Sequence, residues 1–198
     1  MNQETLDIIG RRHTVEQTKN AFHLARKAGF DNINMDLIVG LPGEDITKVQ
    51  HTLDEVKALG PDSLTVHSLA VKRAARLNIF RDKYQEMTFE NNQEIMNLTM
   101  KTAYEMGMGP YYLYRQKNIA GNFENVGYAK VDKAGIYNIL IMEEKQPIIA
   151  LGAGGSSKLV FDHGQRIERV ENVKDVVNYI TRIDEMIERK REGIAKWL

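Results

Sequence analysis

One aspartate interrupts an apolar stretch of this sequence, in the run NMDLIVGLPGE at residues 34–44. Asp36 comes directly before three apolar residues, and a loop with two glycines and a proline follows them. A carboxylate buried in a strand is costly unless it is ion-paired or hydrogen-bonded. If Asp36 faces the inside of an α/β barrel, it needs a partner such as an arginine or a ligand hydroxyl. If it faces outward, it is an ordinary solvated residue, and the sequence leaves both interpretations open.

The loop GLPGED, residues 40–45, ends the same expected strand and begins a helix. In open and barrel α/β sheets, ligands bind at the carboxyl ends of strands, where helix N-termini present free N–H groups. A phosphate or carboxylate would be suited to such a loop. The alternative is a tight turn that needs its glycines for positive φ.

A second glycine-rich run, LGAGGSSKL at residues 151–159, is not a nucleotide-binding motif. A Walker loop needs Gly-Lys-Ser/Thr, but here Ser157 precedes Lys158 and a leucine follows it. A dinucleotide fingerprint needs glycine or alanine where Ser157 stands. The five histidines show no metal-ligand spacing, and we expect His67 to be a core residue. The sequence therefore yields no catalytic residue and no metal ligand.

The composition limits the kinds of partner. Lys+Arg and Asp+Glu both number 27, so no net charge favours nucleic acid or an anionic membrane. The chain holds no apolar run near the roughly 20 residues that span a bilayer and no signal peptide at its start, so we expect a cytoplasmic protein. The cysteine count is zero, which excludes disulfides, thiolate metal sites and cysteine nucleophiles within these residues.

The chemistry-bearing residues lie on elements that alternate between helix and strand. Apolar periodicity and capping residues predict four helices, at about 14–29, 46–59, 89–107 and 173–192. Strands are expected at 32–40, 63–71 and 135–144, and within 147–172 around a hairpin turn at 162–165. Helix, strand, helix, strand with short connections is typical of βα units with parallel strands. Because the first helix has no convincing strand before it, we expect the chain to begin inside a larger α/β domain.

Three runs resemble a known family: GRRHTVEQTKNAFHLARKAGFDNINMDLIVGLPGED (10–45), LGPDSLTVHSLAVKRAARL (59–77) and LGAGGSSK (151–158). They look like the later half of the oxygen-independent coproporphyrinogen III dehydrogenases, which are radical S-adenosylmethionine enzymes of haem biosynthesis. The run YYLYRQKNIAGNFENVGYA (111–129) resembles the branch called HemZ. The resemblance covers nearly the whole chain.

The resemblance implies a fold and a chemistry. The expected fold class is α/β, with the later part of a partial (β/α)6 radical SAM barrel in residues 1–80 and a mixed α+β C-terminal region in residues 81–198. Family members hold a [4Fe-4S] cluster on three cysteines, and the cluster cleaves S-adenosylmethionine to a radical. The radical begins the oxidative decarboxylation of propionate side chains to vinyl groups on a tetrapyrrole. This chain has no cysteine, so it resembles a C-terminal fragment that cannot bind the cluster and is inactive alone.

The resemblance also assigns cofactor-binding positions residue by residue. The family's S-adenosylmethionine contacts correspond here to Arg11, Asp36 and Ala70, with Arg11 as the expected charged companion of Asp36. The glycine-rich run matches a segment near the adenine, where Lys158 occupies the contact position. A carboxylate can accept hydrogen bonds from ribose hydroxyls or an amino group, and an arginine can pair with a carboxylate.

Two other functions compete with the dehydrogenase. Related proteins of the same fold carry haem, so a haem chaperone is the alternative among binding proteins. A phosphate-binding α/β metabolic enzyme that uses the GLPGED loop is the third. We expect a tetrapyrrole as substrate, no nucleic acid or membrane partner, and self-association of the fragment through an exposed barrel edge.

Overall fold

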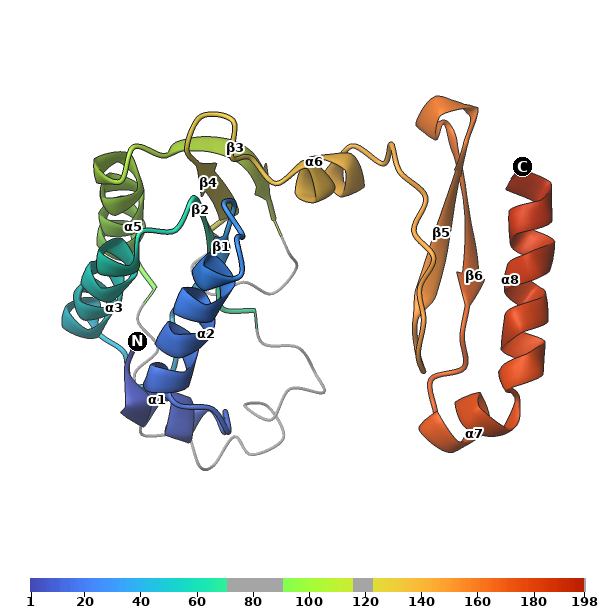
Figure 1. Ribbon diagram of the computed structural model, residues 1–198, viewed down its shortest axis with the longest axis horizontal. Coiled ribbons are helices and arrows are strands. Elements are labelled where there is room, and N and C mark those ends of the chain that lie inside the picture. The colour runs from blue at the N-terminus through green and yellow to red at the C-terminus, as the bar shows by residue number, and fades with distance from the viewer. Residues whose placement is uncertain (71–90, 116–122, 198) are drawn as a thin grey trace. The chain divides into compact units, whose positions relative to one another are not determined.

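The chain divides into two compact units in a computed structural model that describes residues 1–70, 91–115 and 123–197 (Figure 1). Unit 1 comprises Met1–Gly135 and unit 2 comprises Ile136–Leu198. The boundary predicted at residue 80 lies outside the described residues. Unit 1 contains a four-stranded sheet and unit 2 a two-stranded sheet.

Unit 1 alternates helices and strands in its first half, as the sequence pattern predicts. The described elements are α1 (Gln3–Ile8), α2 (Val15–Lys27), β1 (Asn34–Val39), α3 (Ile46–Leu59), β2 (Ser63–Ser68), α5 (Gln93–Glu105), β3 (Gly109–Tyr114) and β4 (Asn125–Ala129).

The sheet of unit 1 runs in the order β1-β2-β4-β3. β1 and β2 are parallel, in the register that pairs Asp36 with Thr65 and Ile38 with His67. β4 is antiparallel to both β2 and β3. The parallel pair predicted from the first half of the sequence is thus present, and strands from after residue 80 extend the same sheet.

Local signals explain where the helices of unit 1 begin and end. Thr14 caps α2 through a capping box, in which its hydroxyl accepts from the Gln17 N–H and the Gln17 side chain accepts from the Thr14 N–H. The Asp45 side chain caps α3 by accepting from the Lys48 N–H. Gly60 ends α3 in the left-handed conformation, with a φ of 69°.

The core of unit 1 lies between one face of the sheet and the helices α3 and α5, which pack side by side (Figure 1). Val39 of β1, Leu53 of α3, Leu64 of β2 and Ile95 of α5 are each 0% exposed. Side chains alternate between the faces of a strand, so the residues between these core positions face the other side of the sheet. On β1 those residues are Asn34, Asp36 and Ile38.

A buried carboxylate connects α2 to the sheet. Asp62, just before β2, lies 2.6 Å from the Arg26 guanidinium and accepts a 2.9 Å hydrogen bond from the Ile33 N–H. Burial alone raises the pKa of Asp62, but the hydrogen bonds from Ile33 and Arg26 and the charge of Arg26 outweigh it. The net effect lowers the pKa of this carboxyl below its usual value.

Replacing Asp62 by asparagine should therefore lower the free energy of unfolding at neutral pH, by about 1–3 kcal/mol. Because the pKa is lower in the folded state, this stabilisation is present above the unfolded-state pKa of about 3.9 and is lost as the pH falls through the folded-state value. Urea unfolding of both chains between pH 7 and pH 3 measures the difference. A difference that stays constant over this range would contradict the assignment.

Unit 2 is built on a β-hairpin. β5 (Ser156–Phe161) and β6 (Arg166–Glu171) pair antiparallel around a 3₁₀ turn at Asp162–Gly164, where the sequence predicts the turn. The helices α7 (Val176–Thr181) and α8 (Ile183–Trp197) follow, and α8 packs on β5. Gly193 of α8 approaches Leu159 closely, and the Trp197 indole N–H donates a 2.8 Å hydrogen bond to the Val160 carbonyl oxygen.

Two predictions in this half of the chain are wrong. The run at 135–144 is not a strand but contains the helix α6 (Ile136–Met142), because a short apolar run fits either period. The single helix predicted at 173–192 is two helices, which break at Arg182. Its apolar face is not buried either: Val177 is 67% exposed and Ile180 is 63% exposed.

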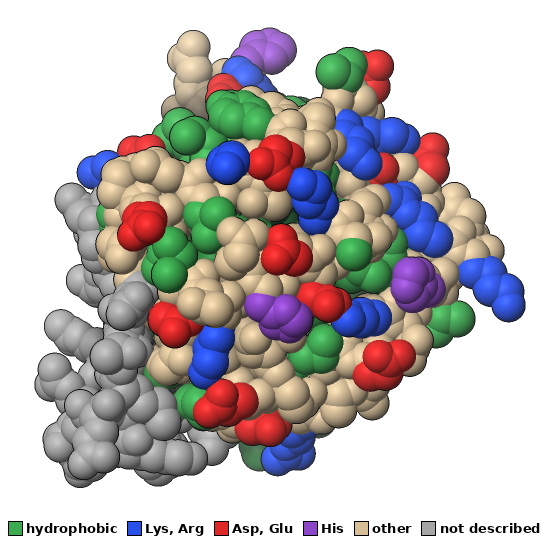
Figure 2. Space-filling view, turned by 90° about the vertical axis from the view of Figure 1, so that its left-hand side faces the viewer, with side chains coloured by type: hydrophobic (Ala, Val, Ile, Leu, Met, Phe, Trp, Pro, Cys, Tyr) green, Lys and Arg blue, Asp and Glu red, His purple; other side chains and the backbone are tan. Residues whose placement is uncertain are grey.

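Opposite charges are interspersed on the surface. Figure 2 shows Lys, Arg, Asp and Glu side chains mixed across the face that it presents. Between α3 and α5, Lys57 lies 2.6 Å from Glu105. Such mixing accords with the equal numbers of acidic and basic residues. No helix within the described parts of the chain is long and apolar enough to cross a membrane.

Candidate functional site

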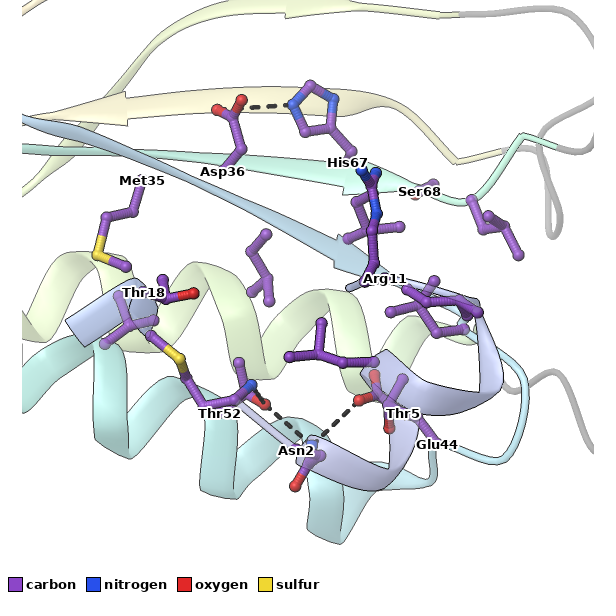
Figure 3. Close-up of a pocket in the computed structure, with 18 of the residues that line it drawn as sticks. Asn2, Thr5, Arg11, Thr18, Met35, Asp36, Glu44, Thr52, His67 and Ser68 are labelled. Carbon is purple, nitrogen blue, oxygen red and sulfur yellow. Dashed lines mark hydrogen bonds and ion pairs between the residues drawn. The ribbon is translucent and has the colours of Figure 1, made fainter. Parts of the chain in front are cut away.

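A cavity of about 600 Å³ lies in unit 1, around the carboxyl-terminal part of β1 and β2 (Figure 3). Its lining comes from α1 and the segment after it, from the first turn of α2, from both faces of β1, from the end of β2, and from the middle of α3. Single residues of β3 and β4 complete it. This volume is within the usual range for sites that bind small molecules. The cavity therefore has the size and the mixed polar and apolar lining of a ligand site.

Asp36 faces this cavity from the side of β1 opposite the core (Figure 3). Its side chain is 64% exposed, and its Oδ1 accepts a 2.7 Å hydrogen bond from the Asn34 amide. The same Oδ1 lies 3.8 Å from Nε2 of His67. The interaction with His67 is the main cause that lowers the pKa of Asp36. Burial opposes the shift, and the Asn34 amide adds to it.

His67 is the neighbour of Asp36 that sequence reasoning missed. It lies on β2, is half-buried, and its Nδ1 is 3.3 Å from the Tyr114 hydroxyl. We predicted a core histidine, but its side chain lines the cavity. A signal was available: in parallel register, residues 63, 65 and 67 alternate onto the same face as 34, 36 and 38.

Arg11 and Ala70 line the same cavity as Asp36. Arg11 follows α1, and Ala70 lies just past β2. The predicted ion pair between Arg11 and Asp36 is not formed among the described residues, where the charged group beside Asp36 is His67. The structure thus brings together three of the four predicted cofactor positions, with a different companion for the carboxylate.

Lys158, the fourth predicted position, belongs to unit 2. It is the third residue of β5, and its side chain is 11% exposed. Its ammonium lies 3.8 Å from the Glu144 carboxylate and 3.5 Å from the Ile141 carbonyl oxygen. In this unit the Lys158 ammonium thus interacts with a backbone carbonyl and a carboxylate at the C-terminal end of α6.

Two buried polar side chains form the part of the cavity next to α1. Thr5 is 2% exposed, and within the described parts of the chain its hydroxyl has no hydrogen-bond partner. Glu44 is 5% exposed and accepts a 3.0 Å hydrogen bond from the Asn2 amide (Figure 3). Buried polar groups are normally hydrogen-bonded, so the unpartnered hydroxyl of Thr5 is the kind of group that a bound ligand satisfies.

Tyrosines of β3 lie beside the Asp36 face of the sheet. The rings of Tyr112 and Tyr114 are stacked, with an interplanar angle of 7°. Tyr112 lies across Gly127, where an added Cβ would be 2.0 Å from its ring, so only glycine fits beneath it. Burial raises the pKa of Tyr112, while a hydrogen bond to Thr65 opposes the shift. The tyrosines therefore form an aromatic border to the cluster of Asp36 and His67.

The GLPGED loop is less suited to an anion than its sequence suggests. The Asp45 carboxylate already occupies the N-terminus of α3, and the buried carboxylate of Glu44 is next to it. Lys48, the basic residue of this turn, is paired with Glu4 at 2.9 Å. Negative charge at this helix start disfavours phosphate.

The residues present do not form an iron–sulfur site. The chain contains no cysteine, and clusters are held by cysteine thiolates. Within residues 1–70, 91–115 and 123–197, no group of three or more acidic or histidine side chains is placed to hold a metal ion.

Comparison with known proteins supports the motif resemblance. Residues 1–56 match the model of the radical SAM superfamily. The chain is 46% identical over 187 residues to the oxygen-independent coproporphyrinogen-III oxidase-like protein HemZ of Bacillus subtilis, an alignment that covers 94% of this chain and 37% of HemZ. It is 35% identical over 69 residues to the haem chaperone HemW of the same organism, covering 35% of this chain and 18% of HemW.

A solved structure shares the fold. Coproporphyrinogen III oxidase (HemN) from Escherichia coli, described as a radical SAM enzyme, matches with a TM-score of 0.65 at 20% identity, over 93% of this chain and 41% of HemN. The resemblance and the α/β radical SAM fold predicted from the sequence are thus confirmed. The chain spans well under half the length of these relatives.

Proposed function

We propose that this chain is the later part of an oxygen-independent coproporphyrinogen III dehydrogenase and that its cavity binds S-adenosylmethionine. The observation that carries the proposal is that Arg11, Asp36 and Ala70, from three separate segments, line one cavity. Two of them fall within residues 1–56, which match the superfamily model. The relatives' names say oxidase for the same oxygen-independent reaction.

The cavity residues fit S-adenosylmethionine by their chemistry. The exposed carboxylate of Asp36 can accept hydrogen bonds from ribose hydroxyls or from the amino group of the methionyl part. Arg11 can pair with the methionyl carboxylate, since it has no ion pair among the described residues. Ala70 leaves room for an adenosyl group, and the unpartnered Thr5 hydroxyl can bond a further polar atom.

This chain's part in the reaction is binding and orientation. In the family, S-adenosylmethionine supplies the one-electron chemistry that removes hydrogen from a propionate side chain. The chain's own residues do not fit the [4Fe-4S] cluster, because they include no thiolate ligand. We therefore propose that the cluster is held elsewhere in a longer protein and that the chain alone is inactive. The proposed substrate of that protein is a tetrapyrrole, and its proposed location is the cytoplasm.

The full reading frame that contains this chain tests the function. A C-x3-C-x2-C motif upstream would support a radical SAM protein, and its absence would exclude both the dehydrogenase and the haem chaperone. The purified full-length protein should convert coproporphyrinogen III under anaerobic conditions, in the presence of a reductant and S-adenosylmethionine. Stoichiometric haem binding without conversion would instead identify a chaperone. The higher identity to HemZ, 46% over 94% of this chain, favours the dehydrogenase, because a haem chaperone HemW that matches 90% of this chain is only 22% identical to it.

The isolated chain should also self-associate. Among the described strands β1 pairs only with β2, so its outer edge presents unpaired backbone groups. Sedimentation velocity should show a mass that rises with protein concentration, and a monodisperse monomer would contradict this. A Val177→Lys variant distinguishes the strand edge from the exposed face of α7, because association through β1 is unaffected by it.

A further inference from the structure

Three side chains from three strands lie together on the face of the sheet opposite the core. Asp36 lies on β1, His67 on β2 and Tyr114 on β3. His67 is central: its Nε2 is 3.8 Å from Asp36 Oδ1, and its Nδ1 is 3.3 Å from the Tyr114 hydroxyl. All three side chains line the cavity. His67 therefore links the Asp36 carboxylate to the hydroxyl of Tyr114, which is far from both in the sequence.

The geometry gives each nitrogen of the imidazole a different partner. A neutral imidazole carries one donor and one acceptor, so the partner of Nδ1 decides what Nε2 presents. The Tyr114 ring also packs edge-on against the imidazole, with centroids 6.3 Å apart at 71°. The tyrosine thus restricts the plane of the imidazole, and the Nε2 of His67 donates toward Asp36 when the Tyr114 hydroxyl donates to Nδ1.

Exposure decreases from Asp36 to His67. The Asp36 side chain is 64% exposed, while that of His67 is 26% exposed. The carboxylate is therefore accessible to a ligand, and the imidazole behind it is largely covered. A covered side chain close to an exposed ligand-binding group restricts the orientation of that group.

We propose that His67 is a positioning residue: Tyr114 orients its imidazole, and the imidazole holds the orientation of the Asp36 carboxylate at the cavity. The proposal rests on the proposed binding of S-adenosylmethionine, since that molecule is the ligand to which the Asp36 carboxylate would hydrogen-bond. The lowered pKa of Asp36, with His67 as its main cause, accords with this arrangement.

Other ionisable groups lie near Asp36 or line the same cavity. Tyr112 of β3 lies near enough for the charge of Asp36 to affect its pKa. Arg11 and His13, after α1, and Glu44, before α3, line the same cavity. Because none of these forms an ion pair with Asp36 among the described residues, His67 is the group to vary.

The first arm of the test needs no ligand. The side-chain carboxyl resonance of Asp36 is followed by NMR as a function of pH in the 198-residue chain and in His67→Phe, Tyr114→Phe and His51→Asn variants. We expect the Asp36 titration midpoint to move to higher pH in His67→Phe and to stay unchanged in the control His51→Asn, whose histidine is exposed on α3. Tyr114→Phe should change the imidazole ¹⁵N shifts that report the tautomer. An unchanged Asp36 midpoint in His67→Phe would overturn the proposal.

The second arm measures binding of S-adenosylmethionine to the same chains. His67→Phe should lower the affinity about tenfold. Glutamine at 67 can place a side-chain N–H near the position of Nε2, so His67→Gln should restore most of the affinity, while His67→Asn, which mimics Nδ1, should not. Equal affinities for these variants and the wild type would also overturn the positioning role. If the wild-type chain and a longer protein containing it both fail to bind, the proposed function fails, and the carboxyl titration still decides the role of His67.

Discussion

Replacing Asp36 by asparagine should lower the affinity of the chain for S-adenosylmethionine by about tenfold or more, because hydrogen bonds to a charged group contribute about 1.5–3 kcal/mol. Asparagine has nearly the same shape as aspartate but one fewer acceptor and no charge. The exposed position of Asp36 keeps the substitution from disturbing the core, since its neighbours Met35 and Leu37 face the other side of the strand. The loss of affinity should therefore occur with only a small loss of stability, from the interactions of Asp36 with Asn34 and His67.

Ligand-induced NMR shifts, which remain measurable for weak complexes, give the dissociation constant for each chain. The matched control is Asp54→Asn, because Asp54 is exposed on α3 and, among the residues that the structure describes, is hydrogen-bonded within its own helix, to Gln50. Wild-type and Asp54→Asn chains should bind alike. Equal binding by Asp36→Asn would show that the cavity does not use this carboxylate.

Replacing Leu53 by alanine should cost unit 1 about 2–5 kcal/mol of its free energy of unfolding, which is a large part of the stability of a typical domain. Leu53 is 0% exposed on α3 and lies in the cluster that joins this helix to β1, β2 and α5. The loss combines the transfer of the buried side chain with the cavity that its removal leaves. Because α3 also lines the ligand cavity, Leu53→Ala should also lower the affinity for S-adenosylmethionine as unit 1 becomes less stable.

Urea unfolding monitored by circular dichroism measures this loss. Leu24→Ala on α2 is the control, because Leu24 is 65% exposed and its truncation should change the free energy of unfolding by less than about 0.5 kcal/mol. Equal effects of the two substitutions would mean that α3 is not packed on the sheet as described.

The parts of the fold that follow from local rules were predictable. The helix predicted at 46–59 is α3, Ile46–Leu59, because an aspartate cap, an apolar period and a terminal glycine all agree. The helix after Thr14 is present for the same kind of reason. Where local signals conflict, prediction failed: the apolar run at 135–144 fits a strand and a helix equally, and α6 is the result.

The candidate site was predictable only in part. Asp36 stood out because a carboxylate is unusual within an apolar strand, and the cavity beside it agrees with the expectation of an inward-facing residue. Its companion depends on which strands become neighbours, and a single sequence does not show that directly. Arg11 and His67 both lie in runs that resemble the family, but the resemblance assigned no role to His67, whose place beside Asp36 comes from the β1–β2 register.

The order of strands in unit 1 also has a kinetic consequence. β5 and β6 pair across a turn of a few residues, and such hairpins form within about 1–10 μs. β2 pairs with β4 from Ser63↔Ala129 to Val66↔Val126, so these partners are separated by about 60 residues or more of chain. Closing so long a segment before any contact forms slows folding. β2 is thus made well before β4 during synthesis, and while the β2 edge that pairs with β4 is open, misassembly with other chains competes with folding.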